Sequence, residues 1–430
     1  MPKVDTWALI ISNCKRYTAS MREQPSSNFF GLDVGTSTVR CVVGVIESGD
    51  SAARPAIIGH GSAPNLGMRK GVVIHIDDVA EAIAQAVTEA ERHAGVQIHQ
   101  ATVNINGSHV GGVNSRGVIA ISAANRDITA DDRMRVEEAA TIVKLPSNRE
   151  IIQVFAKNYR LDGQENIKDP IGMQGVRLEV DTHIVTASTP SLRNLDLALE
   201  KAHVLPMHHT VSSLAAAEAV LGRQQKEAGT VLVDIGAGTT NMVVLEDGEV
   251  QHVAVLPIGG THITNDLAIG LRTDLDIAEA VKLQHGGLGK HKKNSRLSVG
   301  SGNNRHDFDG AEIHMIIEAR VEELMEYIDK ELKKIQRSRK LPGGAVLVGG
   351  TAKLPGIAEF GRESLGLAVR VGKLQPVGGL LDTVNDPAYF TAVGLMLLDM
   401  LLAPAAGNIA GAPNPGVFRM VEGLVKRFKR

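Results

Sequence analysis

The sequence predicts an α/β protein made of two similar halves, and three observations carry this prediction. Strand-like and helix-like segments alternate along most of the chain, which favours parallel or mixed sheets with helices on their faces. A strand–Asp–Gly motif occurs twice: Phe30–Gly35 returns as Leu232–Gly236, so that Asp234 follows Asp33 by 201 residues. The chain has 45 glycines but only 3% aromatic residues, which suits tight turns better than an all-β sandwich.

Local patterns justify the individual elements. Residues 29–34 and 39–46 form a predicted β-hairpin, because Gly35–Thr38 separates two β-rich runs. Asp77 or Asp78 is expected to cap the first predicted helix. The other predicted elements are helices over 78–94, 131–143 and 192–202 and strands over 101–105, 176–187 and 345–348.

Length and charge narrow the class of protein. A chain of 430 residues is long enough for two or three cores. Lys and Arg (46) balance Asp and Glu (48), so no overall field attracts nucleic acid, and no nucleic-acid partner is expected. Two cysteines, Cys14 and Cys41, are too few for a disulfide scaffold, which makes a reducing cytoplasm the default. No apolar run reaches the ~20 residues that span a bilayer.

Three segments fall outside this regular pattern. Residues 1–28 are interpreted as an N-terminal extension, either a disordered tail or an over-long start before Met21. Residues 286–311 are interpreted as a mobile loop, because they are rich in Gly, Lys, Asn and Ser. Its basic residues are interpreted as solvated rather than as a nucleic-acid patch, because aromatic residues do not interleave with them. Residues 403–416 have the Pro, Gly and Ala composition of a linker.

The repeated Gly-rich turn predicts a phosphate site. Such turns expose backbone N–H groups and hydroxyls that suit phosphate oxygens. Two of them could hold a polyphosphate from both sides, while Asp33 and Asp234 hold a hydrated Mg²⁺, which takes only one or two carboxylates. The alternative, that both are ordinary turn aspartates, stays open on the residues alone.

The last 14 residues predict an amphipathic helix that lies on a membrane. One stripe is apolar, at Val417, Phe418, Val421, Leu424, Val425 and Phe428. The cations around it are Arg419, Lys426, Arg427, Lys429 and Arg430. A helix of ~21 Å is too short to cross a bilayer, but its cations suit anionic lipid headgroups. A terminal helix that docks on the protein body is the alternative.

Several motifs together resemble the FtsA family of bacterial cell-division proteins, within the superfamily of actin, Hsp70 and sugar kinases. The two Gly-rich turns resemble that superfamily's phosphate loops, and Gly349–Ala352 resembles its adenosine motif. The segments that narrow the resemblance to FtsA are 67–71 (GMRKG), 106–109 (NGSH), 169–179, 259–266 (GGTHITND) and 278–282 (AEAVK). The resemblance covers roughly residues 29–400 and the C-terminal tip, while residues 1–28 and the 286–311 insertion fall outside it.

This resemblance implies an actin-like, two-lobed α/β fold with a small α+β insertion domain, and it implies ATP and Mg²⁺ as cofactors. From the residues alone, Glu279 and Lys282 would be a helix-surface pair. The resemblance instead gives the phosphate contacts as Gly35, Thr36, Ser37, Gly236, Gly238, Thr239 and Thr240. It gives the adenosine side as Glu279, Lys282, Gly349 and Gly350.

The same resemblance implies the limits of each subdomain. The insertion, subdomain 1C, is expected at 104–180. The other expected ranges are 29–103, 181–229 and 385–402 for subdomain 1A, 230–257 and 329–384 for subdomain 2A, and 258–328 for subdomain 2B.

Three positions depart from the family pattern. Ala237 and Asn241 stand where the family commonly has another Gly and a closing Asp. Ala237 is tolerable if its φ is negative, whereas Asn241 removes a charge near the metal. Ser212 stands where Hsp70-like relatives carry an acidic residue that positions water, and it is a poor base. We therefore name no catalytic base and expect at most a slow ATPase, with nucleotide mainly an assembly ligand.

By resemblance, the chain would polymerise at the cytoplasmic face of the cell membrane and tether the ring of the tubulin-like protein FtsZ at the division site. The expected partners are FtsZ, further copies of the chain, an anionic lipid surface and other division proteins. Two alternatives are a pilus-assembly ATP-binding protein, which would lack the basic C-terminal helix, and a soluble ATPase or kinase of the same superfamily.

Overall fold

The structure is a computed structural model that describes residues 28–47, 54–122, 125–289, 296–300, 302 and 305–402. The predicted N-terminal extension apart from Asn28, the predicted 403–416 linker and the predicted 417–430 helix lie outside these residues. Within the described ranges, no helix combines the length and the apolar character needed to cross a membrane.

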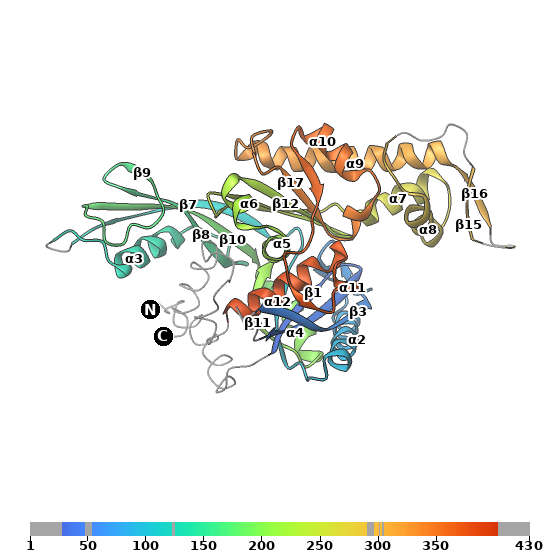
Figure 1. Cartoon of the computed structure of the whole chain (residues 1–430), viewed down its shortest axis with the longest axis horizontal. Helices are drawn as coiled ribbons and strands as arrows, with labels where there is room; N and C mark the ends of the chain where they lie inside the picture. Colours follow the sequence, from blue (N-terminus) through green and yellow to red (C-terminus); the bar gives the residue numbers. More distant parts are fainter. Residues whose placement is uncertain are drawn as a thin grey trace.

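The first lobe is built on a six-stranded mixed sheet in the order β11-β6-β1-β2-β3-β19 (Figure 1). Strand β2 pairs antiparallel with β1 and with β3, while β6 lies parallel to β1 and to β11, and β19 lies parallel to β3. Helices α2 and α4 pack on one face of the sheet and α12 on the other. The bounds are β1 (Asn28–Val34), β2 (Thr38–Glu47), β3 (Arg54–Pro64), β6 (Gln100–Ile105), β11 (Leu205–Val211), β19 (Gly378–Gly379), α2 (Ile76–Ala94), α4 (Thr189–Lys201) and α12 (Phe390–Leu402).

Helix α12 lies unusually close to β1. A Cβ atom on Gly31 would lie 2.2 Å from the carbonyl oxygen of Ala392, so only glycine fits there. Asp399 of the helix accepts hydrogen bonds from the Phe30 backbone N–H (3.1 Å) and the Thr102 hydroxyl (3.0 Å). These contacts fix β1, and with it the turn that follows, against α12.

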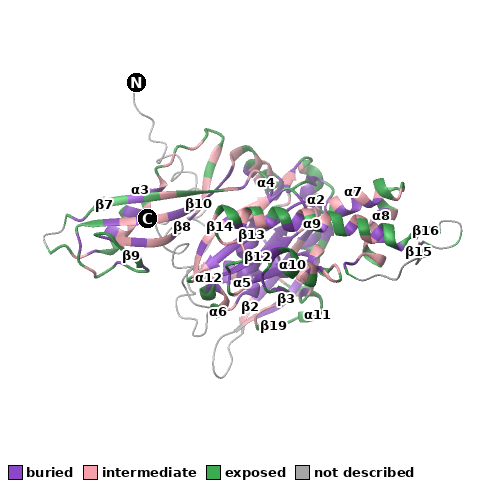
Figure 2. Cartoon of the chain, turned by 90° about the horizontal axis from the view of Figure 1, so that it is seen from above, coloured by how far each residue is buried: buried purple, intermediate pink, exposed green. Residues whose placement is uncertain are grey.

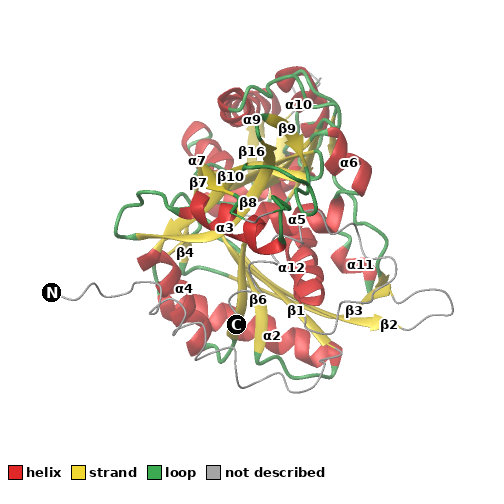
Figure 3. Cartoon of the chain, turned by 90° about the vertical axis from the view of Figure 1, so that its left-hand side faces the viewer, coloured by secondary structure: helices red, strands yellow, loops and turns green. Residues whose placement is uncertain are grey.

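The second lobe repeats this plan with a five-stranded sheet in the order β14-β13-β12-β17-β18. Its central strand β12 pairs antiparallel with β13 and parallel with β17, as β1 does with β2 and β6. The strands are β12 (Thr230–Ile235), β13 (Thr240–Glu246), β14 (Glu249–Leu256), β17 (Ala345–Val348) and β18 (Val369–Val371). The helices of this region are α5 (Ser212–Val220), α6 (Arg223–Ala228), α7 (Gly260–Gly270), α8 (Leu275–His285), α9 (Gly310–Lys334) and α10 (Ile357–Leu365). Figure 3 shows how these helices and those of the first lobe surround the strands.

A separate four-stranded sheet, in the order β7-β10-β8-β9, projects from the lobes at the left of Figure 1. Helix α3 packs on β7 and β10 and begins with a capping box, in which the Thr129 hydroxyl and the Asp132 carboxylate each accept the other's backbone N–H. The bounds are β7 (Gly111–Ala120), α3 (Ala130–Thr141), β8 (Arg149–Leu161), β9 (Gln164–Ile167) and β10 (Arg177–Ser188). The expected insertion limit at residue 180 thus falls inside β10.

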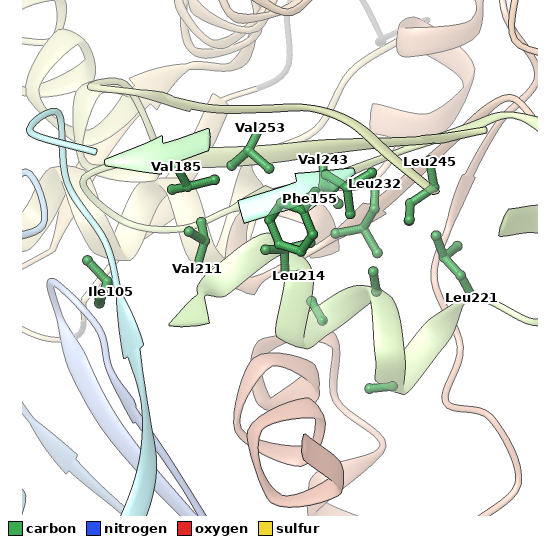
Figure 4. Close-up of a cluster of buried hydrophobic side chains, with 14 of the residues drawn as sticks. Ile105, Phe155, Val185, Val211, Leu214, Leu221, Leu232, Val243, Leu245 and Val253 are labelled. Atoms are coloured by element: carbon green, nitrogen blue, oxygen red, sulfur yellow. The ribbon is translucent and has the colours of Figure 1, made fainter. Parts of the chain in front are cut away.

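One continuous hydrophobic core joins these parts. Phe155 of the insertion is 1% exposed and lies among side chains of the second lobe and α5, including Leu232 and Leu214 (Figure 4). Figure 2 shows the central strands buried and the outer helix faces exposed. The base of the insertion is therefore packed into the two-lobed body.

The predicted strands and helices are confirmed, with ends shifted by no more than three residues. The predicted cap was wrong. The N-cap of α2 is His75, and Asp77 and Asp78 lie in the first turn, where their charges favour the positive end of the helix dipole. The remaining short elements are β4 (Met68–Arg69), β5 (Val72–Val73), η2 (Gly350–Lys353), α11 (Leu381–Val384) and η3 (Pro387–Tyr389).

The interpretation of 286–311 as one loop was also wrong in part. Residues 296–299 and 306–309 form an antiparallel hairpin, β15 (Arg296–Val299) and β16 (His306–Asp309), beside α8. Its Leu297 and Phe308 pack against the core of the second lobe, a packing that composition alone did not indicate. Residues 290–295, which hold most of the basic run, lie outside the described residues.

Candidate nucleotide site

The two Gly-rich turns have the same hydrogen-bonded geometry. In the first lobe Gly35 donates its backbone N–H to the carbonyl of Thr38 (3.2 Å), and in the second Gly236 donates to Thr239 (2.9 Å). The flanking strands also pair in the same register. Val34 lies opposite Val39 on either side of the first turn, and the equivalent strand residues lie opposite each other on either side of the second turn. The repeat found in the sequence is therefore a repeat in structure.

These turns meet where the two lobes face each other. A Cβ atom on Gly238 would lie 2.8 Å from a methyl carbon of Thr36, so the loops are in van der Waals contact. The Thr239 hydroxyl donates to the Asn106 side-chain oxygen (2.8 Å) at the end of β6. Gly71, in the β4–β5 turn, donates its N–H to the Thr36 hydroxyl (3.1 Å). Residues of both lobes thus line one loop junction.

Two predicted loop residues have different environments. Ser37 is exposed, so its hydroxyl is accessible. Thr240 is fully buried and donates its hydroxyl to the carbonyl of Ile258 (2.8 Å), which gives it a structural partner on β14's side of the sheet. Ala237 does not adopt a positive φ, which is the condition under which alanine was expected to be tolerated there.

Asp33 and Asp234 are the second-last residues of the central strands β1 and β12, and both are buried. Asn104 holds Asp33 by donating its amide to a carboxyl oxygen (2.7 Å), while its own oxygen accepts the Val34 N–H (2.7 Å). Asp234 has a longer bond, donated by the Thr391 hydroxyl of α12 (3.3 Å). The first aspartate is fixed within its lobe, and the second is tied to the opposite lobe.

The electrostatic environment of this aspartate pair raises the pKa of both carboxyls. Burial raises the pKa of Asp33 to about 7, an effect that Arg40 opposes and the charge of Asp234 increases. Burial likewise raises the pKa of Asp234 to about 6, against the Thr391 hydrogen bond and the charge of Arg40. A divalent cation beside them would favour their ionised forms.

Arg40 and Asn241 belong to this site, although sequence reasoning gave the first no role. Arg40 lies opposite Asp33 in the β1–β2 pair, and Asn241 lies opposite Asp234 in the β12–β13 pair. The Arg40 guanidinium stands over the Tyr389 ring, 5.3 Å from its centroid. The hairpin register offered a signal, because a four-residue turn after Val34 places Arg40 across from Asp33.

The expected adenosine side forms a connected chain of hydrogen bonds that reaches the second loop. Lys282 donates to Glu279 (2.6 Å), to the Thr264 hydroxyl (2.8 Å) and to the Gly260 carbonyl (3.2 Å). The Gly260 N–H and the Thr351 hydroxyl both donate to the carbonyl of Gly236 (2.9 and 3.0 Å). Glu279 and Lys282 are therefore more than a helix-surface pair.

Gly349 and Gly350 occupy the turn between β17 and η2. Gly349 has a φ of 88°, and a Cβ there would lie 2.4 Å from a carboxyl oxygen of Asp234. Its N–H donates to the carbonyl of Pro387 (3.0 Å). The turn at Gly349 and the Asp234 carboxyl are thus in direct contact.

The donor set fits Mg²⁺ bound through water. In the described part of the chain, no group of three or more His, Cys, Asp and Glu side chains could enclose a metal by itself. A buried carboxylate pair still suits Mg²⁺, which keeps several waters and uses few protein ligands. Asn241 supports the fit, because both of its buried amide atoms lack a partner among the described residues.

Ser212 takes part in the same network but not as a base. Its hydroxyl accepts from the Asn104 amide (3.0 Å), the group that also holds Asp33. A neutral hydroxyl fixed in this way is a poor proton acceptor at pH 7. The membrane-binding residues predicted from Val417 to Arg430 lie outside the described residues.

Family models match two parts of this chain. The model for "Cell division protein FtsA" matches residues 231–394, which cover the second loop and the adenosine side. The model for the "SHS2 domain inserted in FTSA" matches residues 107–186, which cover the projecting sheet.

Similar proteins cover nearly the whole chain. The cell division protein FtsA of Bacillus subtilis is 37% identical over 391 residues, which is 90% of this chain and 87% of that protein. The FtsA protein of Neisseria meningitidis is 35% identical over 95% of this chain and 98% of its own length. Among solved structures, a PilM–PilN type IV pilus biogenesis complex shares the fold with a TM-score of 0.61 and 19% identity, over 87% of this chain and 99% of that one.

Proposed function

Since the chain belongs to the FtsA family of cell division proteins, we propose that it binds ATP, polymerises on the cytoplasmic membrane and tethers the FtsZ ring there. Its fold is the actin-like two-lobed α/β fold with an inserted SHS2 domain. The observation that carries the nucleotide part is the pair of equivalent Gly-rich turns in contact between the lobes.

In this proposal the triphosphate lies between the two turns. The N–H groups and hydroxyls of Gly35 to Ser37 and of Gly236 to Thr239 bind its oxygens. Asp33 and Asp234 hold Mg²⁺ through water, and Glu279, Lys282, Gly349 and Gly350 lie beside the adenosine. The magnesium ion supplies positive charge to the phosphates. Thr240, whose hydroxyl is already donated to a carbonyl, supports the loop.

Nucleotide acts mainly as an assembly ligand in this proposal. No residue is assigned as the catalytic base, and Ser212 stands where a base would be needed, so turnover stays far below the ~10 per second of a typical enzyme. ATP binding favours one arrangement of the lobes, and a filament selects that arrangement. Hydrolysis then resets the filament slowly.

In this proposal the helix predicted at residues 417–430 connects the filament to the membrane. Its apolar stripe and five cations favour an anionic lipid surface, and a single 14-residue helix binds reversibly. Many helices on one filament bind far more firmly through effective concentration. The division site and FtsZ as cargo follow from the family, as do contacts with other division proteins.

Two alternatives named from the sequence have less support. The pilus-assembly reading rests on a shared fold at 19% identity, against 37% for an FtsA protein. A soluble ATPase or kinase of the superfamily would leave the basic amphipathic segment without a role.

Flotation with anionic liposomes tests the proposal. The full chain, a chain ending at Gly416 and the variant Phe428→Glu are each mixed with vesicles, with and without Mg-ATP, and purified FtsZ is added. We expect only the full chain to float, more of it with ATP, and to carry FtsZ with it. Phe428→Arg, which breaks the apolar stripe but keeps the basic character, is the matched control for charge.

Two results would contradict specific parts. Equal flotation of all variants, or of none, would overturn membrane tethering. Flotation of the full chain without FtsZ would leave the membrane anchor and overturn the tether.

A further inference from the structure

Two segments that resemble FtsA motifs, 67–71 and 106–109, lie against each other beside the loop junction. They meet at Gly71 and Gly107, which both have a positive φ (73° and 113°). A Cβ atom on Gly71 would lie 2.6 Å from the Gly107 backbone nitrogen, and a Cβ on Gly107 would lie 2.7 Å from the Gly71 carbonyl oxygen. Only glycines let the two backbones approach this closely. Neither segment has a role in the proposed phosphate and adenosine contacts.

This pair of glycines is connected to both Gly-rich turns. The Gly71 N–H donates to the Thr36 hydroxyl of the first turn (3.1 Å). The Asn106 side-chain oxygen accepts the Thr239 hydroxyl of the second turn (2.8 Å) and also the Gly107 N–H (2.8 Å). Because one oxygen holds both donors, a shift of the second turn relative to the first lobe changes the hydrogen bond that orients Gly107.

The chain runs from Gly107 directly into the inserted sheet (β7-β10-β8-β9). Val110 donates its N–H to the Gly107 carbonyl (3.0 Å), and β7 begins at the next residue, Gly111. Arg149, the first residue of β8, donates to the carbonyl and the hydroxyl of Thr186 in β10 (3.1 and 2.8 Å). That hydroxyl donates to the Gly111 carbonyl (3.3 Å). The turn at Gly107 is therefore linked to the base of three inserted strands.

His109 is the side chain of this turn that has an unused buried group. Its Nδ1 lacks a partner among the described residues, and a Cβ on Gly107 would lie 2.8 Å from it. A cavity of about 10 Å³, lined by His109 together with Asn104 and Asn106, has room for one water. Burial and the charge of Arg149 lower the pKa of His109 to about 4, so the ring is neutral at pH 7. Since an unpaired buried nitrogen is costly, a water in this cavity would hold the ring in place.

We infer that the segment 106–110 transmits the occupancy of the nucleotide site to the inserted SHS2 domain, with His109 as a positioning residue. ATP orders the two turns and so fixes the bond from Thr239 to Asn106, which in turn fixes Gly107. The His109 ring, held through the cavity water, keeps the turn aligned with the base of β7. Bound ATP thereby reduces local opening of the inserted sheet at that base. The inference rests on the proposed ATP binding.

The test is amide hydrogen exchange of the full chain with and without Mg-ATP. The wild type is compared with His109→Phe, which keeps a ring but removes Nδ1, and with His109→Asn, which restores a polar atom at the δ position. His99→Ala is the matched control, because His99 is exposed just before β6 in the first lobe. Calorimetry gives the Kd for ATP, and thermal unfolding shows that each variant is folded. His109→Leu, with a smaller apolar side chain, takes the place of His109→Phe if the latter does not fold.

We expect Mg-ATP to slow exchange in residues 107–118 by about fivefold or more in the wild type, in His109→Asn and in His99→Ala, which is the lower end of coupling between sites. His109→Phe should show no such slowing, although its Kd for ATP stays within about threefold of the wild type. Slowing of the 236–240 turn without any change in 107–118 of the wild type would overturn the inference, and so would equal slowing in His109→Phe. If calorimetry finds no ATP binding by any of the proteins, the proposed nucleotide function fails, and the inference fails with it.

Discussion

The two Gly-rich hairpins are alike in backbone and differ in the residues that hold their aspartates. Both turns close with the same Gly-to-Thr hydrogen bond, and both central strands lie between an antiparallel and a parallel neighbour. Asp33 is fixed by Asn104 inside its own lobe, whereas Asp234 is bonded to Thr391 of α12, on the other lobe. In the repeated backbone, one aspartate is therefore fixed within its own lobe, and the other depends on how the two lobes are arranged.

The largest expected effect comes from filling the space beside Asp234. Gly349→Ala would place a Cβ 2.4 Å from the Asp234 carboxyl and 2.5 Å from the carbonyl of Ile235, at a φ of 88°. We expect a loss of about 3 kcal/mol or more in the free energy of unfolding, with loss of ATP binding. Urea unfolding and ATP titration measure both.

Gly350→Ala is the matched control for that change. The nearest heavy atom to its Cβ would be 4.0 Å away, on Ala388, and its φ is not positive. Equal destabilisation by both alanines would show that the turn is sensitive as a whole and that contact with Asp234 is not the cause.

The variant Asn104→Ala tests how firmly Asp33 is fixed within its lobe. This change leaves the Val34 N–H and the Asp33 carboxyl without their partner, in a buried site, and should cost about 2–3 kcal/mol. Thr391→Val removes only the 3.3 Å bond to Asp234 and should cost about 0.5 kcal/mol. Equal losses in chemical unfolding would remove the distinction between a fixed and a responsive aspartate.

The pH dependence of the nucleotide-free protein separates the aspartates further. The pKa of Asp33 rises from an ordinary 3.8 to about 7 on folding. As pH rises, the unfolded chain therefore loses this proton at a lower pH than the folded protein does, and the free energy of unfolding falls between about pH 4 and pH 7. Asp33→Asn keeps an acceptor for Asn104 and removes the penalty. We expect it to gain about 2 kcal/mol at pH 8 and nothing below pH 4.

Asp234→Asn should give a smaller gain over a window that ends near pH 6, since its pKa rises only to about 6. Thermal unfolding across pH 4–8 follows both variants. A variant of Asp33 that gains equally at pH 4 and pH 8 would show that the gain does not come from ionisation.

The sequence predicted the duplicated hairpins because Asp and Gly recur in the same order at each strand end, and local spacing is enough to place a turn. It did not predict that Glu279, Thr264 and Lys282 form one network, because that contact depends on how α7 and α8 pack. A family resemblance, and no local pattern, brought those residues into the site.

The errors have physical causes as well. The prediction of an Asp cap for α2 failed because acidic residues are favoured both at the N-cap and in the first turn, and composition does not separate these positions. The hairpin β15–β16 was missed because its strands have four residues each and few apolar side chains. Short elements of this kind are stabilised by tertiary packing rather than by their own pattern.

A smaller effect, that of Thr239→Val, tests whether the loop junction joins the lobes. Thr239 and Thr38 are equivalent in the repeat, but the Thr239 hydroxyl donates to Asn106 of the other lobe (2.8 Å), whereas the Thr38 hydroxyl has a long 3.4 Å contact with the Ser37 hydroxyl on the surface. Thr239→Val should therefore cost about 1 kcal/mol in chemical unfolding, and Thr38→Val close to nothing. Because the Asn106 bond spans the lobes, Thr239→Val should also speed amide hydrogen exchange in the 236–240 turn, while Thr38→Val leaves it unchanged. If both valines act alike, the lobes are held together at the α12 contacts and not at the loops.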